Sequence, residues 1–277
     1  MGAASPAPKD EGPGHAAGAA SLNSPAKTIA TIEARMTSRR LPGKVLLPAA
    51  GRPMLAHLIA RLRRVPTIDG IVVATTTNTT DDPVARLAEA EGAGCFRGSE
   101  NDVMARVLGA AEGAGAEVIV EITGDCPVID PMIIDQTIRL YHANPCDYAS
   151  NVQVRSYPIG MDTQVFSTAT LRRSFEMTDD PWVREHVTPH IRKNPDLFRQ
   201  VTLVAPADLW WPELGLVLDE QSDYVLLKNV IEHFADRKPD FDCGDMITLL
   251  KTVHPEWVAL NNAVVRTAAK KKAAGEP

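Results

Sequence analysis

The sequence lacks the features that mark several large classes of protein. Its four cysteines are widely scattered, with no Cys-x-x-Cys pair and no histidine at zinc-site spacing. The longest apolar runs, such as 45–47 and 118–120, are far shorter than a membrane span requires. The chain does not open with a basic segment followed by an apolar core, the pattern of a secretory signal. We therefore expect reduced thiols in a cytoplasmic protein.

The chain also lacks an excess of positive charge. Its net charge is −6, so the protein as a whole would repel nucleic acid and anionic membranes, and neither is an expected partner. The run Lys270–Lys272 lies in an Ala-rich tail and is more typical of a solvated terminus than of a nucleic-acid site. With 44% hydrophobic residues, 277 residues are enough for a sizeable core.

Composition divides the chain into three segments. Residues 1–27 are mainly Ala, Gly, Pro and Ser and predict a disordered N-terminal extension. Residues 28–235 alternate short β-branched runs with longer helical stretches, which is typical of βαβ units. Residues 236–277 predict a short helix near Asp245–Thr252 and a basic tail. The fold class is therefore α/β, with a mainly parallel sheet flanked by helices.

The central segment contains a series of predicted elements. The strands are Thr28–Ala34, Gly70–Thr75, Val118–Ile122, Asp147–Asn151, Thr163–Phe166, Gln200–Val204 and Leu216–Leu218. The helices are Met54–Arg64, Pro83–Glu91, Asp102–Glu112, Pro131–His142, Thr168–Ser174, Pro181–Lys193 and Ser222–Phe234.

A basic loop follows the first strand and contains Arg35, Arg40 and Lys44 around Gly43. Its place at the carboxyl end of a strand is where open α/β sheets bind ligands. Arginine forks bind phosphate oxygens in pairs, and lysine supplies a mobile point charge. The loop therefore predicts a polyphosphate site. It matches neither a Walker A loop nor a GxGxxG motif, so a solvated basic loop remains the alternative.

Two aspartates directly follow predicted strands. Asp125 lies in TGDCP after the third strand, and Asp219 lies in LVLDEQSDY after the last. A pair of carboxylates facing a phosphate loop suits Mg²⁺, although Asp125 could instead cap the helix beginning near Pro131. Asp223 is better explained as an acid at the start of a helix.

Three other polar or aromatic residues are weaker candidates. His186 could act as a general base, but a pocket-lining or surface position is the more common role for such a histidine. Trp210 and Trp211 could stack on a base, although a hydrophobic hinge or an oligomer contact is the more common use.

The order of motifs from Thr28 to Phe234 resembles the sugar-nucleotide cytidylyltransferases. The similarity is greatest to the spore-coat polysaccharide biosynthesis type, a relative of the synthetases of CMP-3-deoxy-manno-octulosonate and CMP-sialic acids. The motifs are RMTSRRLPGK, GRPM, VVATT, FRGSENDVMAR, EITGDCPVIDP, DYASN, YPIGMDTQVF, REHVTPHI and LDEQSDY.

The resemblance implies a Rossmann-like nucleotidyltransferase domain over 28–235 and Mg²⁺-dependent transfer of CMP from CTP to a sugar acceptor. The acceptor would be an acidic sugar used for surface glycans, and the protein would be a homodimer. By matching positions, the triphosphate would contact Arg35, Ser38, Arg40 and Lys44, with Arg40 and Lys44 acting in catalysis. Mg²⁺ would bind Asp125 and Asp219, the nucleoside would lie near Thr75, Arg97 and Ser99, and the acceptor near Tyr157, Gly160 and Asp162.

The sequence departs from the family pattern in two places. Gln164 stands where the type commonly has a glutamate, which puts the acceptor in question, and Glu220-Gln221 differ from the usual residues after the second metal aspartate. The residues alone leave open another nucleotide, a sugar-phosphate or phosphonate acceptor, and a non-catalytic nucleotide-binding module.

Overall fold

The computed structural model describes residues 1–2 and 26–262. The predicted disorder of residues 1–27 and the predicted role of Lys270–Lys272 concern residues almost wholly outside these ranges. No helix of the described part is long and apolar enough to cross a membrane. Cys95, Cys126, Cys146 and Cys243 are free thiols, so the predicted absence of disulfides is confirmed.

A seven-stranded sheet forms the centre of the molecule, in the order β5-β4-β1-β6-β8-β7-β9. One half is parallel and comprises β5 (Gly94–Gly98), β4 (Gly70–Thr76), β1 (Thr28–Glu33) and β6 (Val118–Thr123). In the other half, β8 (Gln164–Ser167) runs antiparallel to β6 and β7 (Tyr148–Ser150), and β9 (Gln200–Thr202) is parallel to β7. The predicted α/β class with a mainly parallel sheet is confirmed.

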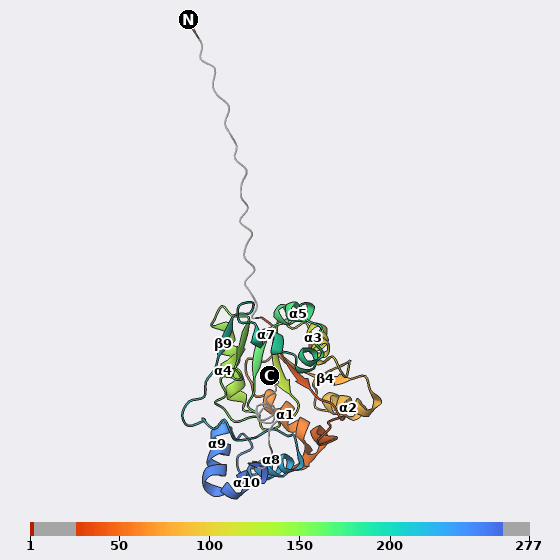
Figure 1. Ribbon diagram of the computed structural model, residues 1–277, viewed down its shortest axis with the longest axis vertical. Coiled ribbons are helices and arrows are strands. Elements are labelled where there is room, and N and C mark those ends of the chain that lie inside the picture. The colour runs from red at the N-terminus through yellow and green to blue at the C-terminus, as the bar shows by residue number, and fades with distance from the viewer. Residues whose placement is uncertain (3–25, 263–277) are drawn as a thin grey trace.

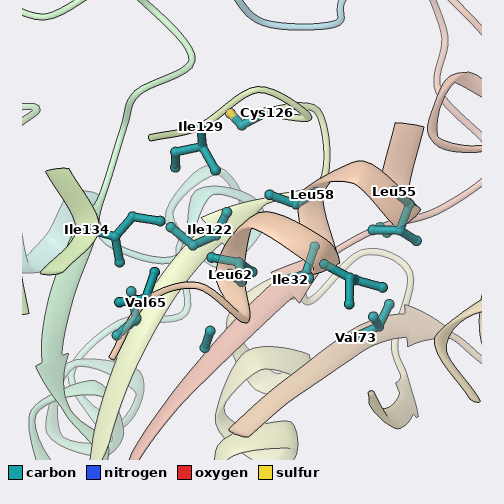
Figure 2. Close-up of a cluster of buried hydrophobic side chains, with 14 of the residues drawn as sticks. Ile32, Leu55, Leu58, Leu62, Val65, Val73, Ile122, Cys126, Ile129 and Ile134 are labelled. Carbon is teal, nitrogen blue, oxygen red and sulfur yellow. The ribbon is translucent and has the colours of Figure 1, made fainter. Parts of the chain in front are cut away.

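Helices cover both faces of this sheet because alternate strand residues are apolar on each side. One face packs against α1 (Met54–Leu62), α2 (Asp82–Ala90) and α4 (Pro131–His142). Figure 2 shows Leu58 and Leu62 of α1 lying against Ile32 and Ile122 of the sheet. The other face packs against α3 (Val103–Gly113), α5 (Thr168–Glu176) and α7 (Pro189–Lys193).

A second core lies at one end of the molecule, where α8 (Gln221–Phe234), α9 (Cys243–Thr248) and α10 (Pro255–Asn262) gather (Figure 1). A π-helical turn, Leu249–Val253, joins α9 to α10. The predicted helix near Asp245–Thr252 corresponds to α9 and this turn. Short elements that the sequence did not predict are β2 (Pro48–Ala49), β3 (Arg52–Pro53), β5, α10, and the 3-10 turns Lys44–Leu46 and Thr79–Asp81.

Two predicted elements are wrong. The helix predicted over Pro181–Lys193 is divided into α6 (Pro181–His186) and α7, because Val187 between them has a φ of 64°. Leu216–Leu218 is not a strand. Its backbone instead donates from Leu216 to Ile159 (2.7 Å) and from Leu218 to Asp125 (2.8 Å), so it crosses the strand ends without joining the sheet.

Candidate active site

The basic loop after β1 folds back on itself and presents Lys44 to the strand ends. Gly43 has a φ of 70°, a left-handed conformation that suits glycine, and its N–H donates to the carbonyl of Met36 (2.9 Å). Lys44 then begins the 3-10 turn Lys44–Leu46. The loop geometry therefore fixes the backbone position from which the Lys44 side chain extends.

Lys44 lies between the two aspartates that the sequence singled out. Its Nζ is 2.9 Å from Oδ2 of Asp125 and 3.1 Å from Oδ1 of Asp219. Arg40 adds a second cation, with Nη2 at 2.6 Å from the same Oδ1 of Asp219. Asp219 and Lys44 are 175 positions apart in sequence, so the tertiary fold alone makes this cluster.

Each aspartate is held by its own surroundings. Thr123 donates its hydroxyl to Oδ1 of Asp125 (2.7 Å). The backbone N–H groups of Asp219 and Glu220 donate to Oδ2 of Asp223, at 3.1 and 3.0 Å. Asp223 thus caps the start of α8, as predicted, and completes a capping box with Glu220. The carboxylate of Asp219 is left to face the cations.

The cluster keeps its charges. Burial of Lys44 opposes its charged form, but the carboxylates of Asp125 and Asp219 outweigh this and raise its pKa. Burial likewise opposes ionisation of Asp125, yet the Lys44 ammonium and the Thr123 hydroxyl lower its pKa. A cationic lysine and an ionised aspartate therefore coexist at neutral pH.

A cleft of about 480 Å³ opens beside this cluster. Five of the residues predicted to bind the triphosphate or metal line it: Arg35, Ser38, Arg40, Lys44 and Asp125. The remaining lining comes from β1 and its loop, the start of α3, the end of β6 and the end of α6, and comprises Glu33, Ala34, Arg39, Val45, Val103, Arg106, Thr123, Gly124, Glu185 and His186. Asp219 reaches the cleft through its contacts with Arg40 and Lys44.

The three residues predicted near the nucleoside lie outside this lining. Thr75 is fully buried in β4. Arg97 is engaged by Asp82 (2.7 Å) and donates to the carbonyl of Thr76 (2.8 Å). Ser99 accepts a hydrogen bond from the N–H of Asp102 (3.1 Å), just before α3. The last two residues therefore fix the segment that leads from β5 into the cleft.

The three residues predicted near the acceptor also lie outside the lining. Tyr157 belongs to the second core, and burial raises its pKa to about 12. Asp162 is paired with Arg155 (3.1 Å for one of the two contacts). Gly160 has a φ of 104°, and a Cβ there would lie 2.3 Å from the carbonyl oxygen of Leu216. Gly160 therefore permits the close approach of the segment that carries Asp219.

Five charged or titratable lining residues were given no catalytic, binding or metal role by sequence reasoning, namely Glu33, Arg39, Arg106, Glu185 and His186. Glu33 and Arg106 lie within a predicted strand and helix, where they look like ordinary members of those elements. Glu185 and His186 end α6, and His186 was considered as a base or pocket residue. A carboxylate at the end of an otherwise apolar strand was the available signal for Glu33. Trp210 is about half exposed and neither it nor Trp211 lines the cleft.

Gln164, the amide that replaces the family's glutamate, also lies outside the cleft lining. Its Nε2 donates to the carboxylate of Glu121, and its Oε1 accepts from the hydroxyls of Tyr148 and Thr188, both at 2.6 Å. Glu121 needs a donor at this point, and a glutamate at 164 could not supply one without a proton. The hydrogen bond to Glu121 therefore explains why this chain has glutamine at position 164.

The residues present fit a magnesium ion. Asp125 and Asp219 both contact a single cationic atom, Lys44 Nζ, so their carboxylates lie on either side of one cation position. Mg²⁺ commonly uses one or two protein carboxylates and completes its shell with phosphates and water. No group of three or more His, Cys, Asp or Glu side chains suited to a metal occurs among the described residues. The site would therefore need substrate oxygens to complete it.

Comparison with known proteins identifies the family. The cytidylyltransferase family model matches residues 29–239. The spore coat polysaccharide biosynthesis protein of Bacillus subtilis is 33% identical over 225 residues, covering 79% of this chain and 92% of the relative. A 3-deoxy-manno-octulosonate cytidylyltransferase of Geobacter sulfurreducens is 36% identical over 118 residues, 42% of this chain and 46% of its own.

A solved structure extends this agreement to the whole fold. The structure of a cytidylyltransferase from Leptospira borgpetersenii matches with a TM-score of 0.81 and 31% identity, covering 87% of this chain and 100% of that one. The parallel half of the sheet and the cation cluster at its carboxyl end are thus parts of an enzyme, and the chain belongs to the cytidylyltransferase family.

Proposed function

We propose that the protein transfers a cytidylyl group from CTP to an acidic sugar acceptor used for surface glycans, and releases pyrophosphate. The observation that carries this proposal is the Lys44 ammonium held between Asp125 and Asp219 beside the cleft. The names of the Bacillus subtilis and Geobacter sulfurreducens relatives support a polysaccharide or octulosonate role.

The reaction is an in-line displacement at the α-phosphorus of CTP. A hydroxyl oxygen of the acceptor forms the new bond to phosphorus and gives up its proton to water, and pyrophosphate leaves with the electron pair of the P–O bond that breaks. Such a step asks little covalent chemistry of the protein, so positioning and neutralisation of charge dominate.

The residues singled out in the sequence have the following roles in this proposal. Arg35 and Ser38 bind the triphosphate, and Arg40 and Lys44 stabilise the charge of the departing pyrophosphate. Asp125 and Asp219 would hold Mg²⁺, which supplies further neutralisation of the phosphates when bound. The Arg97–Ser99 segment is placed beside the nucleoside, with Thr75 beneath it. Tyr157, Gly160 and Asp162 would lie near the acceptor, and Gly160 permits the approach of the segment that carries Asp219.

Pyrophosphate release tests the proposal. The purified protein is incubated with Mg²⁺ and each of CTP, UTP, GTP and ATP, against octulosonates, nonulosonates, neutral sugars and sugar phosphates. We expect release only with CTP and an acidic sugar, with the CMP-sugar product identified by mass spectrometry. Equal rates with other nucleotides would refute the cytidylyl assignment. Tight CTP binding without turnover on any acceptor would refute the transferase assignment.

A further inference from the structure

Glu100 joins three loops beside the cleft. It lies between β5 and α3, outside the cleft lining, and 32% of its side-chain surface is exposed. Its Oε1 accepts from Nη1 of Arg35 (3.2 Å) and from the hydroxyl of Thr37 (2.6 Å), both in the loop after β1. Its Oε2 accepts from Nδ2 of Asn78 (2.7 Å), which follows β4. One carboxylate therefore links the segments that follow β1, β4 and β5.

The backbone at Glu100 is held in place as well. Arg106 of α3 donates its Nη1 to the carbonyl oxygens of Ser99 and Glu100, and the arginine is 2% exposed, so this anchor is buried. Hydrogen bonds from Thr37 and then Asn78 lower the pKa of the Glu100 carboxyl, which keeps it ionised at neutral pH. Glu100 thus presents a fixed anionic acceptor to Arg35.

Arg35 is the member of this arrangement that lines the cleft. Its side chain is 30% exposed, and its contact with Glu100 uses one of its three nitrogens. Thr37 and Asn78 contact the same carboxylate at shorter distances and lie outside the cleft lining. An arginine side chain loses rotamer freedom when it binds a phosphate, and this loss lowers the affinity unless the side chain is ordered beforehand. A neighbour that orders Arg35 before the nucleotide binds therefore increases the affinity.

We propose that Glu100 is a positioning residue for the triphosphate: it orders the Arg35 guanidinium at the cleft and does not itself contact the nucleotide. This inference rests on the proposed function, in which Arg35 binds the triphosphate, and it names the group that prepares Arg35 for that role. Because Arg35 binds the triphosphate and takes no part in the chemical step, loss of Glu100 should weaken nucleotide binding without slowing turnover.

Two substitutions of Glu100 separate the position of the carboxylate from its charge. Glu100→Ala removes the acceptor, and we expect the KM for CTP to rise about fivefold, the effect of having to order one long side chain on binding. Glu100→Gln keeps an oxygen where Arg35 and Thr37 donate, and Asn78 can turn its amide to accept from the new NH₂ group, so we expect a KM for CTP within about twofold of the wild type. The kcat should be unchanged in both.

A double-mutant cycle tests whether Glu100 acts through Arg35. Arg35→Ala alone should raise the KM for CTP about tenfold, the effect of losing one hydrogen bond from a charged group. Adding Glu100→Ala should then change the KM by less than about twofold, because two residues of one network do not act additively. Glu112→Ala is the matched control and should leave the KM unchanged, since Glu112 forms an exposed pair with Arg172. Thermal unfolding checks that each variant is folded.

Three results would overturn the inference. An unchanged or lower KM for CTP in Glu100→Ala would mean that Glu100 does nothing for the triphosphate or competes with it for Arg35. Equal losses in Glu100→Gln and Glu100→Ala would mean that the charge matters and the position does not. Additive losses in the double variant would mean that Glu100 acts without Arg35.

Calorimetry gives a readout that does not need turnover. Inorganic tripolyphosphate with Mg²⁺ carries the phosphates of CTP without the base or the sugar, and we expect Glu100→Ala to bind it about fivefold more weakly than the wild type and Glu100→Gln do. If all three bind it equally, or the wild type does not bind it, the inference fails. Absence of CTP turnover in the wild type would refute the proposed function instead, and the tripolyphosphate affinities would still decide the role of Glu100.

Discussion

Two groups of carboxylates lie in or beside the cleft, and their charges are balanced in different ways. Asp125 and Asp219 contact the cations of Lys44 and Arg40. Glu33 and Glu121 form no ion pair within the part of the chain that the structure describes; burial raises the pKa of both side chains, and the amide of Gln164 donates to Glu121. A mobile cation can interact with a phosphate during the reaction, whereas a buried carboxyl group with a raised pKa favours its neutral form. The comparison therefore separates a charged part of the cleft from an uncharged part.

Removal of Lys44 should have the largest effect, because this lysine contacts both Asp125 and Asp219. Lys44→Ala is expected to lower kcat by about 100-fold or more, as for loss of one preorganised electrostatic donor. The measurement is the steady-state rate of pyrophosphate release from CTP. Lys228→Ala is the matched control, since this lysine forms only a half-exposed pair with Glu232 (3.8 Å). A Lys44→Ala enzyme with normal turnover would exclude the lysine from the mechanism.

A third carboxylate beside Glu33 and Glu121 should destabilise the folded protein. Gln164→Glu removes the N–H that Glu121 accepts and adds a buried acid, so we expect a loss of unfolding free energy on the order of 3 kcal/mol at mildly alkaline pH. The loss should shrink at acidic pH, where the new side chain is protonated. Urea unfolding at both pH values measures it, with exposed Gln153→Glu as control. Equal stability of Gln164→Glu and the wild type at alkaline pH would contradict the described network.

Gly124 lies between the two groups and allows their strands to approach. A Cβ at this position would lie 2.6 Å from the carbonyl oxygen of Glu33 and 3.1 Å from Cβ of Ala34. Gly124→Ala should therefore destabilise the protein by about 1–3 kcal/mol through backbone displacement. Thermal unfolding measures this, with Gly113→Ala as control because nothing lies within 4 Å of its added Cβ. A neutral Gly124→Ala variant would show that the strand ends can separate freely.

The smallest effect concerns the pH dependence of stability. The pKa values of Glu33 and Glu121 are raised in the folded protein, so the folded state binds more protons than the unfolded one above about pH 4.3. This stabilisation is complete at low pH and is lost as the pH rises towards the folded pKa values. Glu121→Gln should reduce this slope by up to about 1.4 kcal/mol per pH unit. Parallel stability curves for the two proteins from acid to neutral pH would contradict the raised pKa of Glu121.

Local sequence patterns predicted much of the parallel half of the fold. β1, β4 and β6 are rich in β-branched and apolar residues, and α4 begins with Pro131 after the cap Asp130, so short-range rules identify them. β5 was missed because GCFRG has two glycines and an arginine in five residues, a composition that does not read as a strand. The break at Val187 was missed because it depends on a single backbone angle.

Sequence patterns pointed to those site residues that lie close to one another in the chain. They did not reveal the contacts between residues that are distant in the chain. The loop Arg35–Lys44 and Asp125 could be found because basic residues and a carboxylate at strand ends have a recognisable pattern. The roles of Tyr157 and Gly160 could not, since these residues pack on the segment before Asp219.

By itself, the sequence determined the alternation of strands and helices, the cations of the loop and the acid Asp125 directly after β6, because these depend on residue types within a few positions of one another. Only the tertiary structure decided that Lys44 lies between Asp125 and Asp219, and that Glu33 faces Glu121. Both contacts follow from strand order and register, which arise from packing between distant parts of the chain.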